Sequence, residues 1–136
     1  MTPKKSPLVK LVVMVKRKKG MSFEDFNRYW TEEHGPLACS LPIFREKVIK
    51  YNQVHLDLPK LQQSGAEHGF PVYDDFDGMV ELYAESYQDL MEFFGSDDYK
   101  NILEPDEEKF AQRDECKMFF VYDEVHLDDP SISSCS

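Results

Sequence analysis

The chain has 136 residues, the size of one domain, and is too short for two lobes with a large cleft between them. It carries 26 acidic and 16 basic side chains, a net charge of −10, and such an acidic surface repels nucleic-acid backbones. With 41% hydrophobic and 13% aromatic residues the chain is too apolar to be disordered, so we expect one folded domain over residues 1–136 that binds no nucleic acid.

The first expected strand covers residues 8–16, where β-branched and other apolar residues occupy both parities. A strand that is apolar on both faces has to be covered on both faces. After a basic turn, Ser22 stands three residues before Asp25, which resembles a capping box and predicts the start of a helix.

This first helix is expected to be amphipathic. Phe26, Trp30 and His34 recur at a spacing of four and form one stripe, which predicts a helix that runs to about His34. We expect Gly35 and Pro36 to interrupt it, with Pro36 opening a further short turn.

A second strand is expected over residues 47–56, and its alternation places Tyr51, Gln53 and His55 on one face. The connection that follows, residues 58–74, is long for a compact domain and is typical of a lid or binding loop. The remaining expected elements are a strand over residues 75–83, a helix over 87–94, irregular helical turns to Phe110, a strand over 117–125 and a frayed tail from Asp128.

The order β-α-β, connection, β-α-β predicts an α+β fold of the ferredoxin-like, split β-α-β type, with a four-stranded antiparallel sheet and helices on one face. Two helices cover only one face of such a sheet. Because the first and last strands are apolar on both parities, we expect the other face to pack against a second copy in a homodimer.

The most informative segment is YWTEEHGPL, residues 29–37, which follows a strand and a basic turn with Gly20. It resembles the corresponding motif of the EthD-type family, and the resemblance extends over about residues 8–127. This resemblance implies a dimeric α+β barrel, a class that includes cofactor-free isomerases, cyclases, decarboxylases and monooxygenases. Short acidic fungal members that look like this chain are associated with aromatic polyketide tailoring in secondary metabolism, as decarboxylases or dehydratases.

His34 is the first candidate for catalysis. It falls in line with Phe26 and Trp30, so its ring is expected to point toward the sheet, and an imidazole there can both take and give a proton. The alternative is a histidine at a helix end that hydrogen-bonds a backbone carbonyl. The position of His34 in the His-Gly-Pro motif of the resembled family favours catalysis or substrate contact.

Tyr51 and His55 are the other catalytic candidates. If their strand face lies under the helices, both can meet His34 across a pocket and bind phenolic or carbonyl oxygens, with His55 as a second acid or base. If that face meets the dimer partner, Tyr and His are common there too. The expected substrate-binding residues are Phe26, Tyr29, Trp30, Gln53, Met118 and Phe120, of which Trp30 either packs in the core or stacks on an aromatic ligand.

We expect no metal site and no cofactor, because the histidines lack HxxH or HExxH spacing and no GxGxxG, Walker or GxSxG motif is present. No apolar run reaches the about 18 residues of a membrane span. Lys10 interrupts the apolar stretch after the basic start, which argues against a signal peptide. Three cysteines without CxxC spacing predict reduced thiols in a cytoplasmic protein, with Cys39 buried.

Together with the aromatic residues and His34, the resemblance implies a cofactor-independent lyase, a decarboxylase or a dehydratase, that acts on an aromatic polyketide by His-mediated proton transfer in an aromatic pocket. Two alternatives stay open. One is a cofactor-free monooxygenase, or a cyclase or isomerase, with the same pocket, and the other is a non-catalytic protein that binds a hydrophobic ligand.

Overall fold

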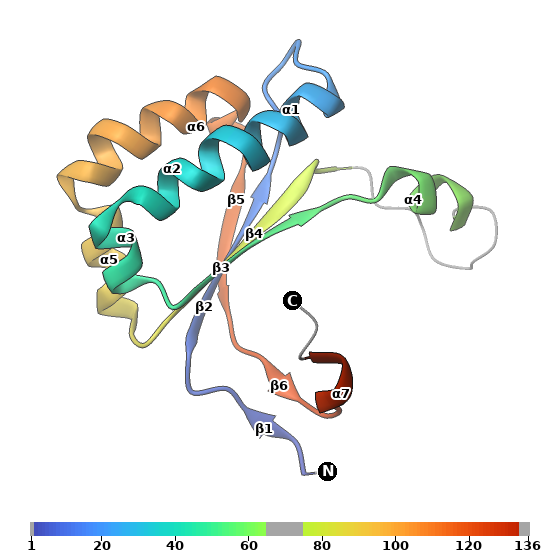
Figure 1. The fold of residues 1–136 in the computed structure, drawn as a ribbon, viewed down its shortest axis with the longest axis vertical. Helices are drawn as coiled ribbons and strands as arrows, with labels where there is room; N and C mark the ends of the chain where they lie inside the picture. The colour runs from blue at the N-terminus through green and yellow to red at the C-terminus, as the bar shows by residue number, and fades with distance from the viewer. Residues whose placement is uncertain (1, 65–74, 134–136) are drawn as a thin grey trace.

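The computed structural model describes residues 2–64 and 75–133 of the chain. At its centre lies an antiparallel sheet of four strands in the order β3-β4-β2-β5 (Figure 1). These strands are β2 (Val9–Val15), β3 (Lys50–His55), β4 (Gly78–Ala84) and β5 (Lys117–Val121). Consecutive strands β2 and β3 are separated by β4, which is the split β-α-β order, so the predicted fold class is confirmed.

A layer of helices covers one face of this sheet (Figure 1). Its members are α1 (Phe23–Tyr29), α2 (Gly35–Ser40), α3 (Pro42–Lys47), α5 (Tyr87–Phe94) and α6 (Glu104–Phe110), joined by π-helical turns at Trp30–His34 and Tyr99–Leu103 and followed by a 3-10 turn at Arg113–Glu115. Helix α4 (Leu58–Ser64) lies apart from this layer and occupies the first part of the connection expected as a lid. The rest of that connection, residues 65–74, lies outside the described residues.

The first helix begins where the capping pattern predicts, with the Asp25 N–H donating to the Ser22 hydroxyl at 3.0 Å. The expected interruption at Gly35 and Pro36 is wrong, because helical backbone continues through both residues. The helix widens into a π turn directly before the proline, and the Gly35 N–H donates to the Trp30 carbonyl, five residues back. Since proline lacks an N–H and crowds the preceding turn of a regular helix, the widened turn lets the helix pass through it.

The register of the sheet decides which side chains face the helices. Leu11 of β2 is fully buried beneath them, and Leu82 of β4 is directly opposite it. Tyr51 stands opposite Leu82, and Gln53 stands opposite Val80. Because cross-strand partners point to the same face, Tyr51 and Gln53 also lie under the helix layer.

The other sheet face carries a charged group among apolar side chains. Lys10 is only 8% exposed, and its Nζ lies 2.9 Å from Glu81 and 3.1 Å from Asp123. Phe119 and Val54 are exposed on the same face as Lys10. Phe119 pairs with Val12, two residues from Lys10, and Val54 pairs with Met79, so both point away from the helices.

Three smaller elements extend beyond the sheet (Figure 1). Strand β1 (Lys4–Lys5) pairs with β6 (Glu124–Val125), and helix α7 (Pro130–Ser133) follows. Part of the tail expected to be frayed is therefore helical, and residues 134–136 lie outside the described residues. Cys39 is exposed rather than buried, because it lies on the outer side of α2. None of the helices in the described ranges has the length and apolar character that a membrane crossing needs.

Candidate active site

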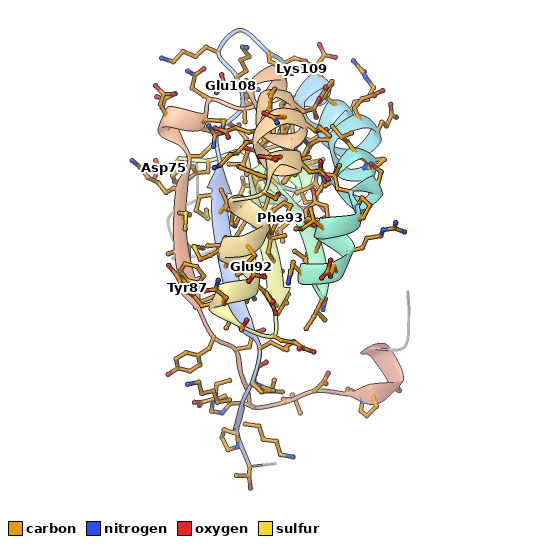
Figure 2. All side chains as sticks on the ribbon, turned by 90° about the vertical axis from the view of Figure 1, so that its left-hand side faces the viewer. Asp75, Tyr87, Glu92, Phe93, Glu108 and Lys109 are labelled. Atoms are coloured by element: carbon orange, nitrogen blue, oxygen red, sulfur yellow. The ribbon has the colours of Figure 1, made fainter. Side chains whose placement is uncertain are left out.

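A cavity of about 500 Å³ lies between the helix layer and the sheet. Its walls are mostly apolar and aromatic, with Leu11 and Val13 from the sheet and Phe93 and Phe94 from α5. Figure 2 views the helix layer from outside and shows Phe93 near its middle. The polar side chains that line the cavity are His34, Tyr51, Tyr99, Glu107, Arg113, Cys116 and Lys117. An apolar hollow of this size with a few converging polar groups is typical of a small-molecule site.

His34 lies at the end of the π-helical turn and lines this cavity. Its Nδ1 is 2.8 Å from Oδ2 of Asp106, so in the neutral imidazole Nδ1 carries the proton and donates it to the carboxylate. Its Nε2 makes no hydrogen bond with a described residue. Because no fully buried side-chain nitrogen or oxygen among the described residues lacks a partner, Nε2 reaches open space in the cavity.

Asp106 holds His34 in this orientation from α6. The carboxylate is 6% exposed, and its Oδ1 accepts a hydrogen bond of 2.5 Å from the Tyr29 hydroxyl. Lys109 lies 3.6 Å from the same oxygen. Asp106 therefore links α6 to the first helix, and it fixes which ring nitrogen of His34 faces the cavity.

Burial sets the charge state of this group. It lowers the pKa of His34, and the raising effect of Asp106 does not outweigh it. Burial alone would raise the pKa of Asp106, but the hydrogen bonds from Tyr29 and His34 lower that pKa by more. Burial and the bond to Asp106 raise the pKa of Tyr29 to about 12. At neutral pH the group is a neutral imidazole, a carboxylate and a neutral phenol, so His34 can accept a proton on Nε2.

Tyr51 reaches the cavity from β3. Its hydroxyl oxygen accepts a hydrogen bond of 2.8 Å from Nε2 of Gln53, and the same amide donates to the Trp30 carbonyl at 2.8 Å. Tyr51 thus keeps its own proton for an oxygen in the cavity. Burial raises the pKa of Tyr51 to about 12, although the bond from Gln53 opposes this, so the phenol stays a neutral donor. Gln53, predicted to bind substrate, positions Tyr51 and lies outside the cavity lining.

A second polar cluster lines the same cavity at α6 and the turn that follows it. Oε1 of Glu107 accepts hydrogen bonds from the Tyr99 hydroxyl at 2.9 Å and from Nε of Arg113 at 3.1 Å. Burial raises the pKa of Glu107 to about 6, against the lowering effect of both donors. A carboxyl group with this pKa exchanges its proton near neutral pH.

The other predicted substrate-binding residues divide into two sets. Trp30 and Met118 line the cavity, and Trp30 is 1% exposed as one of its walls. The residues that lie outside the lining are Phe26, Tyr29 and Phe120. Phe26 is fully buried, with its ring 5.3 Å from that of Trp30. Phe120 packs 5.4 Å from Tyr87, which Figure 2 shows at the edge of the molecule beside β5.

His55 does not share the cavity with His34. Its ring packs 4.4 Å from that of Trp30, and it lines a separate shallow hollow with Phe23 and Asn27. The expectation that His55 meets His34 across one pocket is not fulfilled. His55 lies four residues beyond Tyr51 along β3, about 13 Å at the rise of a strand, which carries it past the end of the cavity.

Sequence reasoning missed the two acids of α6, Asp106 and Glu107. They lie on a helix whose buried stripe is otherwise apolar, between Leu103 and Phe110. An acid within such a stripe is a usable signal, because charged side chains are almost never buried unless they are paired. The signal was lost because residues 99–110 read as irregular turns rather than as one helical segment.

The fold and the site together define a class of protein. It is a ferredoxin-like α+β domain whose aromatic cavity holds a histidine oriented by a buried carboxylate. Within residues 2–64 and 75–133, no three His, Cys, Asp or Glu side chains are grouped so that they could hold a metal ion. The model of the EthD domain family matches residues 18–114, which include both His34 and α6. The chain belongs to the EthD domain family.

Known relatives agree with this assignment. The conidial pigment biosynthesis dehydratase EthD of Metarhizium robertsii is 25% identical over 134 residues, which cover 96% of this chain and 93% of the relative. A dimeric protein of unknown function with a ferredoxin-like fold, from Bacteroides fragilis, has a TM-score of 0.56 at 11% identity, over 90% of this chain and 100% of its own. The hydroxynitrile lyase of Passiflora edulis has a TM-score of 0.55 at 15% identity, over 90% of this chain and 97% of its own. Both structural likenesses concern the fold.

Proposed function

We propose that this protein is a cofactor-independent lyase that removes water from a β-hydroxy ketone of an aromatic polyketide in secondary metabolism. The observation that carries the proposal is the neutral imidazole of His34, held by Asp106, with Nε2 open to an aromatic cavity. The name of the Metarhizium relative, a pigment biosynthesis dehydratase, supports loss of water as the reaction. The hydroxynitrile lyase among the structural relatives supports a lyase more broadly.

The reaction begins with His34 as a base. Its Nε2 removes a proton from the carbon that lies between the ketone and the hydroxyl-bearing carbon. The electron pair moves toward the ketone and forms an enolate, whose oxygen accepts a hydrogen bond from the Tyr51 hydroxyl. The enolate then re-forms the ketone and expels the hydroxyl group, which leaves as water when it gains a proton. In a ring that becomes aromatic, the product is strongly favoured.

The cavity suits a flat, largely apolar substrate. Its volume of about 500 Å³ lies in the range of sites that enclose small organic ligands. The rings of Trp30, Phe93 and Phe110 form walls that can lie against fused aromatic rings and exclude water. Apolar walls also strengthen the hydrogen bond that Tyr51 would give to an enolate oxygen.

The charge state of His34 favours dehydration over decarboxylation. A decarboxylase in this cavity would use His34 as an acid that protonates the ketone or the ring carbon as carbon dioxide leaves. Burial lowers the pKa of His34, so the imidazole is a base at neutral pH and lacks the second proton that this role needs.

We also propose that the protein is a homodimer that buries the sheet face opposite the helices. Phe119 and Val54 are 44% and 36% exposed on that face in the single chain. Exposed apolar side chains on a sheet face are typical of an interface. The description of the Bacteroides fragilis relative as dimeric supports this assembly.

The reaction is tested by the mass of the product. Purified protein is incubated with β-hydroxy-α-tetralone, which becomes α-naphthol when it loses water, and in parallel with α-tetralone that carries a carboxyl group next to its ketone. We expect the first compound to lose the mass of one water molecule faster than without protein, and the second, a β-keto acid that loses carbon dioxide by itself, to do so no faster than without protein. If the protein speeds only the loss of carbon dioxide from the second compound, above the rate without protein, it is a decarboxylase instead, and gain of an oxygen atom would identify an oxygenase.

A further inference from the structure

Dehydration of a hydroxy ketone moves two protons, one from carbon and one to the departing oxygen, and His34 accounts only for the first. We propose that Glu107 is the acid that protonates the departing hydroxyl group, so that the cavity holds a base and an acid on two separate side chains. This inference rests on the proposed dehydration and adds a catalytic residue to it.

The hydrogen bonds of Glu107 leave one of its oxygens open. Both donors, the Tyr99 hydroxyl and Nε of Arg113, bind Oε1. Oε2 has no hydrogen-bond partner among the described residues. No fully buried side-chain oxygen of those residues lacks a partner, and Glu107 lines the cavity, so Oε2 is the oxygen that can carry a proton into it.

Helix α6 carries both this acid and the carboxylate that holds the base, and the acid and the base line the same cavity. Glu107 directly follows Asp106, the carboxylate that holds His34, so one turn of helix serves both proton-transfer groups. The charge of Glu107 also acts on the Tyr51 phenol and helps to raise its pKa. Glu107 therefore lies within electrostatic reach of the hydroxyl group that we expect to bind the ketone.

The surroundings of Glu107 allow it to hold a proton near neutral pH. Burial raises the pKa of Glu107 to about 6, and Glu104 adds to this, whereas Tyr99 and Arg113 lower it. Arg113 is shared between two carboxylates, because its Nη1 also donates to Glu104 at 2.9 Å. The charge of Glu107 in turn shifts the pKa values of four other groups that line the cavity, Tyr51, Tyr99, Arg113 and Cys116.

In the proposed step the carbon–oxygen bond breaks, and its electron pair goes to the oxygen. The proton on Oε2 of Glu107 transfers to that oxygen, and water leaves. Glu107 remains as a carboxylate that Tyr99 and Arg113 stabilise. His34 has meanwhile gained the proton from carbon, and its release, with uptake of a proton by Glu107, restores the site.

The variant Glu107→Gln tests this step, because it keeps the size and the acceptor oxygen of the side chain but has no acidic proton. We expect its kcat with β-hydroxy-α-tetralone to fall about 10²-fold or more, and the decline of wild-type turnover above about pH 6 to disappear. Glu104→Gln is the matched control, since it removes another carboxylate from Arg113 but lies outside the cavity lining. It should keep the wild-type rate at the pH optimum, and its turnover should still decline at high pH, from a somewhat lower pH because Glu104 no longer helps to raise the pKa of Glu107.

A second substrate separates an acid from a structural residue. In β-acetoxy-α-tetralone the leaving acetate needs no proton, so Glu107→Gln should eliminate acetate at nearly the wild-type rate. If this variant does not fold, the wild type still decides, because only the hydroxy compound should show the decline above about pH 6.

The role of Glu107 would be overturned if Glu107→Gln slowed the reactions of both compounds equally, or if it left the rate on the hydroxy compound unchanged. In either case, dehydration by the wild type would still uphold the proposed function. A decline with both compounds in the wild type would overturn it too. No release of water by the wild type would overturn both proposals.

Discussion

Asp106 decides which nitrogen of His34 can act as a base. In Asp106→Asn the side-chain amide can donate to Nδ1, which moves the imidazole proton to Nε2 and leaves no lone pair in the cavity. We expect kcat to fall about 10²–10⁴-fold, the usual worth of a general base. Steady-state rates on β-hydroxy-α-tetralone measure this. Tyr29→Phe removes a hydrogen bond from Asp106 but leaves its carboxylate, so it should lose much less. An Asp106→Asn variant with wild-type kcat would contradict the assigned role.

His34 also makes the stability of the protein depend on pH. Burial lowers its pKa in the folded state, whereas the unfolded chain keeps the ordinary value of 6.5. Below pH 6.5 the unfolded state therefore binds more protons than the folded state. As the pH decreases from 6.5 to the folded-state pKa, the protein becomes less stable.

In His34→Gln this titration is absent. We expect the variant to lose less unfolding free energy than the wild type between about pH 7.5 and about pH 5.5, as measured by urea denaturation at both pH values. All other titrating groups are common to the two proteins, so they largely cancel in the comparison. Parallel pH dependences would mean that the pKa of His34 is not lowered by folding.

At the scale of elements, the close approach of β4 to the first helix shapes one wall of the cavity. A Cβ atom at Gly78 would lie 2.6 Å from Cζ3 and 2.8 Å from Cη2 of Trp30, so the buried indole ring would have to shift to make room for it. We expect Gly78→Ala to cost about 1–3 kcal/mol of stability, as overpacking in a core usually does. Thermal or urea unfolding measures this cost.

The smaller ring of a Trp30→Phe background should relieve this clash, so the cost of Gly78→Ala should be smaller there than in the wild type. A double-mutant cycle of the four proteins gives the coupling directly. Additive effects would show that the indole ring is not what excludes a side chain at Gly78.

Elements of regular pattern could be predicted from the sequence. The helix expected over residues 87–94 is α5, and the β-branched run expected over residues 8–16 contains β2. The π-helical turn before Pro36 could not be predicted, because proline and glycine locally favour a break and only the packing of the whole segment overrides that preference.

The same division holds for the site. The stripe of Phe26, Trp30 and His34 predicts that the imidazole faces inward, because helical spacing is a local property. Its partner Asp106 is 72 residues away, and sequence spacing carries no information about that contact. His55 shares a sheet face with Tyr51 as predicted, but the length of the cavity, which only the assembled fold determines, leaves it outside.

At the scale of the whole molecule, the oligomeric state tests whether the sheet face opposite the helices is the proposed dimer interface. We expect light scattering at micromolar concentration to give the mass of two chains. Phe119→Glu places a charge on the sheet face of the proposed interface and should give a monomer, because burying an unpaired charge is costly.

Tyr87→Glu is the matched control for the dimer. Tyr87 is exposed, like the interface residues, but lies on α5, in the helix layer, so this variant should stay dimeric. A wild type with the mass of one chain, or a Phe119→Glu variant that is still dimeric, would contradict the proposed interface.

The central claim is that His34 transfers the proton, and the rate of His34→Ala on β-hydroxy-α-tetralone tests it most directly. The formation of α-naphthol is followed for wild type and variant side by side, with circular dichroism and light scattering to establish that the variant is folded in the same assembly. We expect turnover to fall about 10²–10⁴-fold. A correctly folded His34→Ala protein that forms α-naphthol at nearly the wild-type rate would contradict the account.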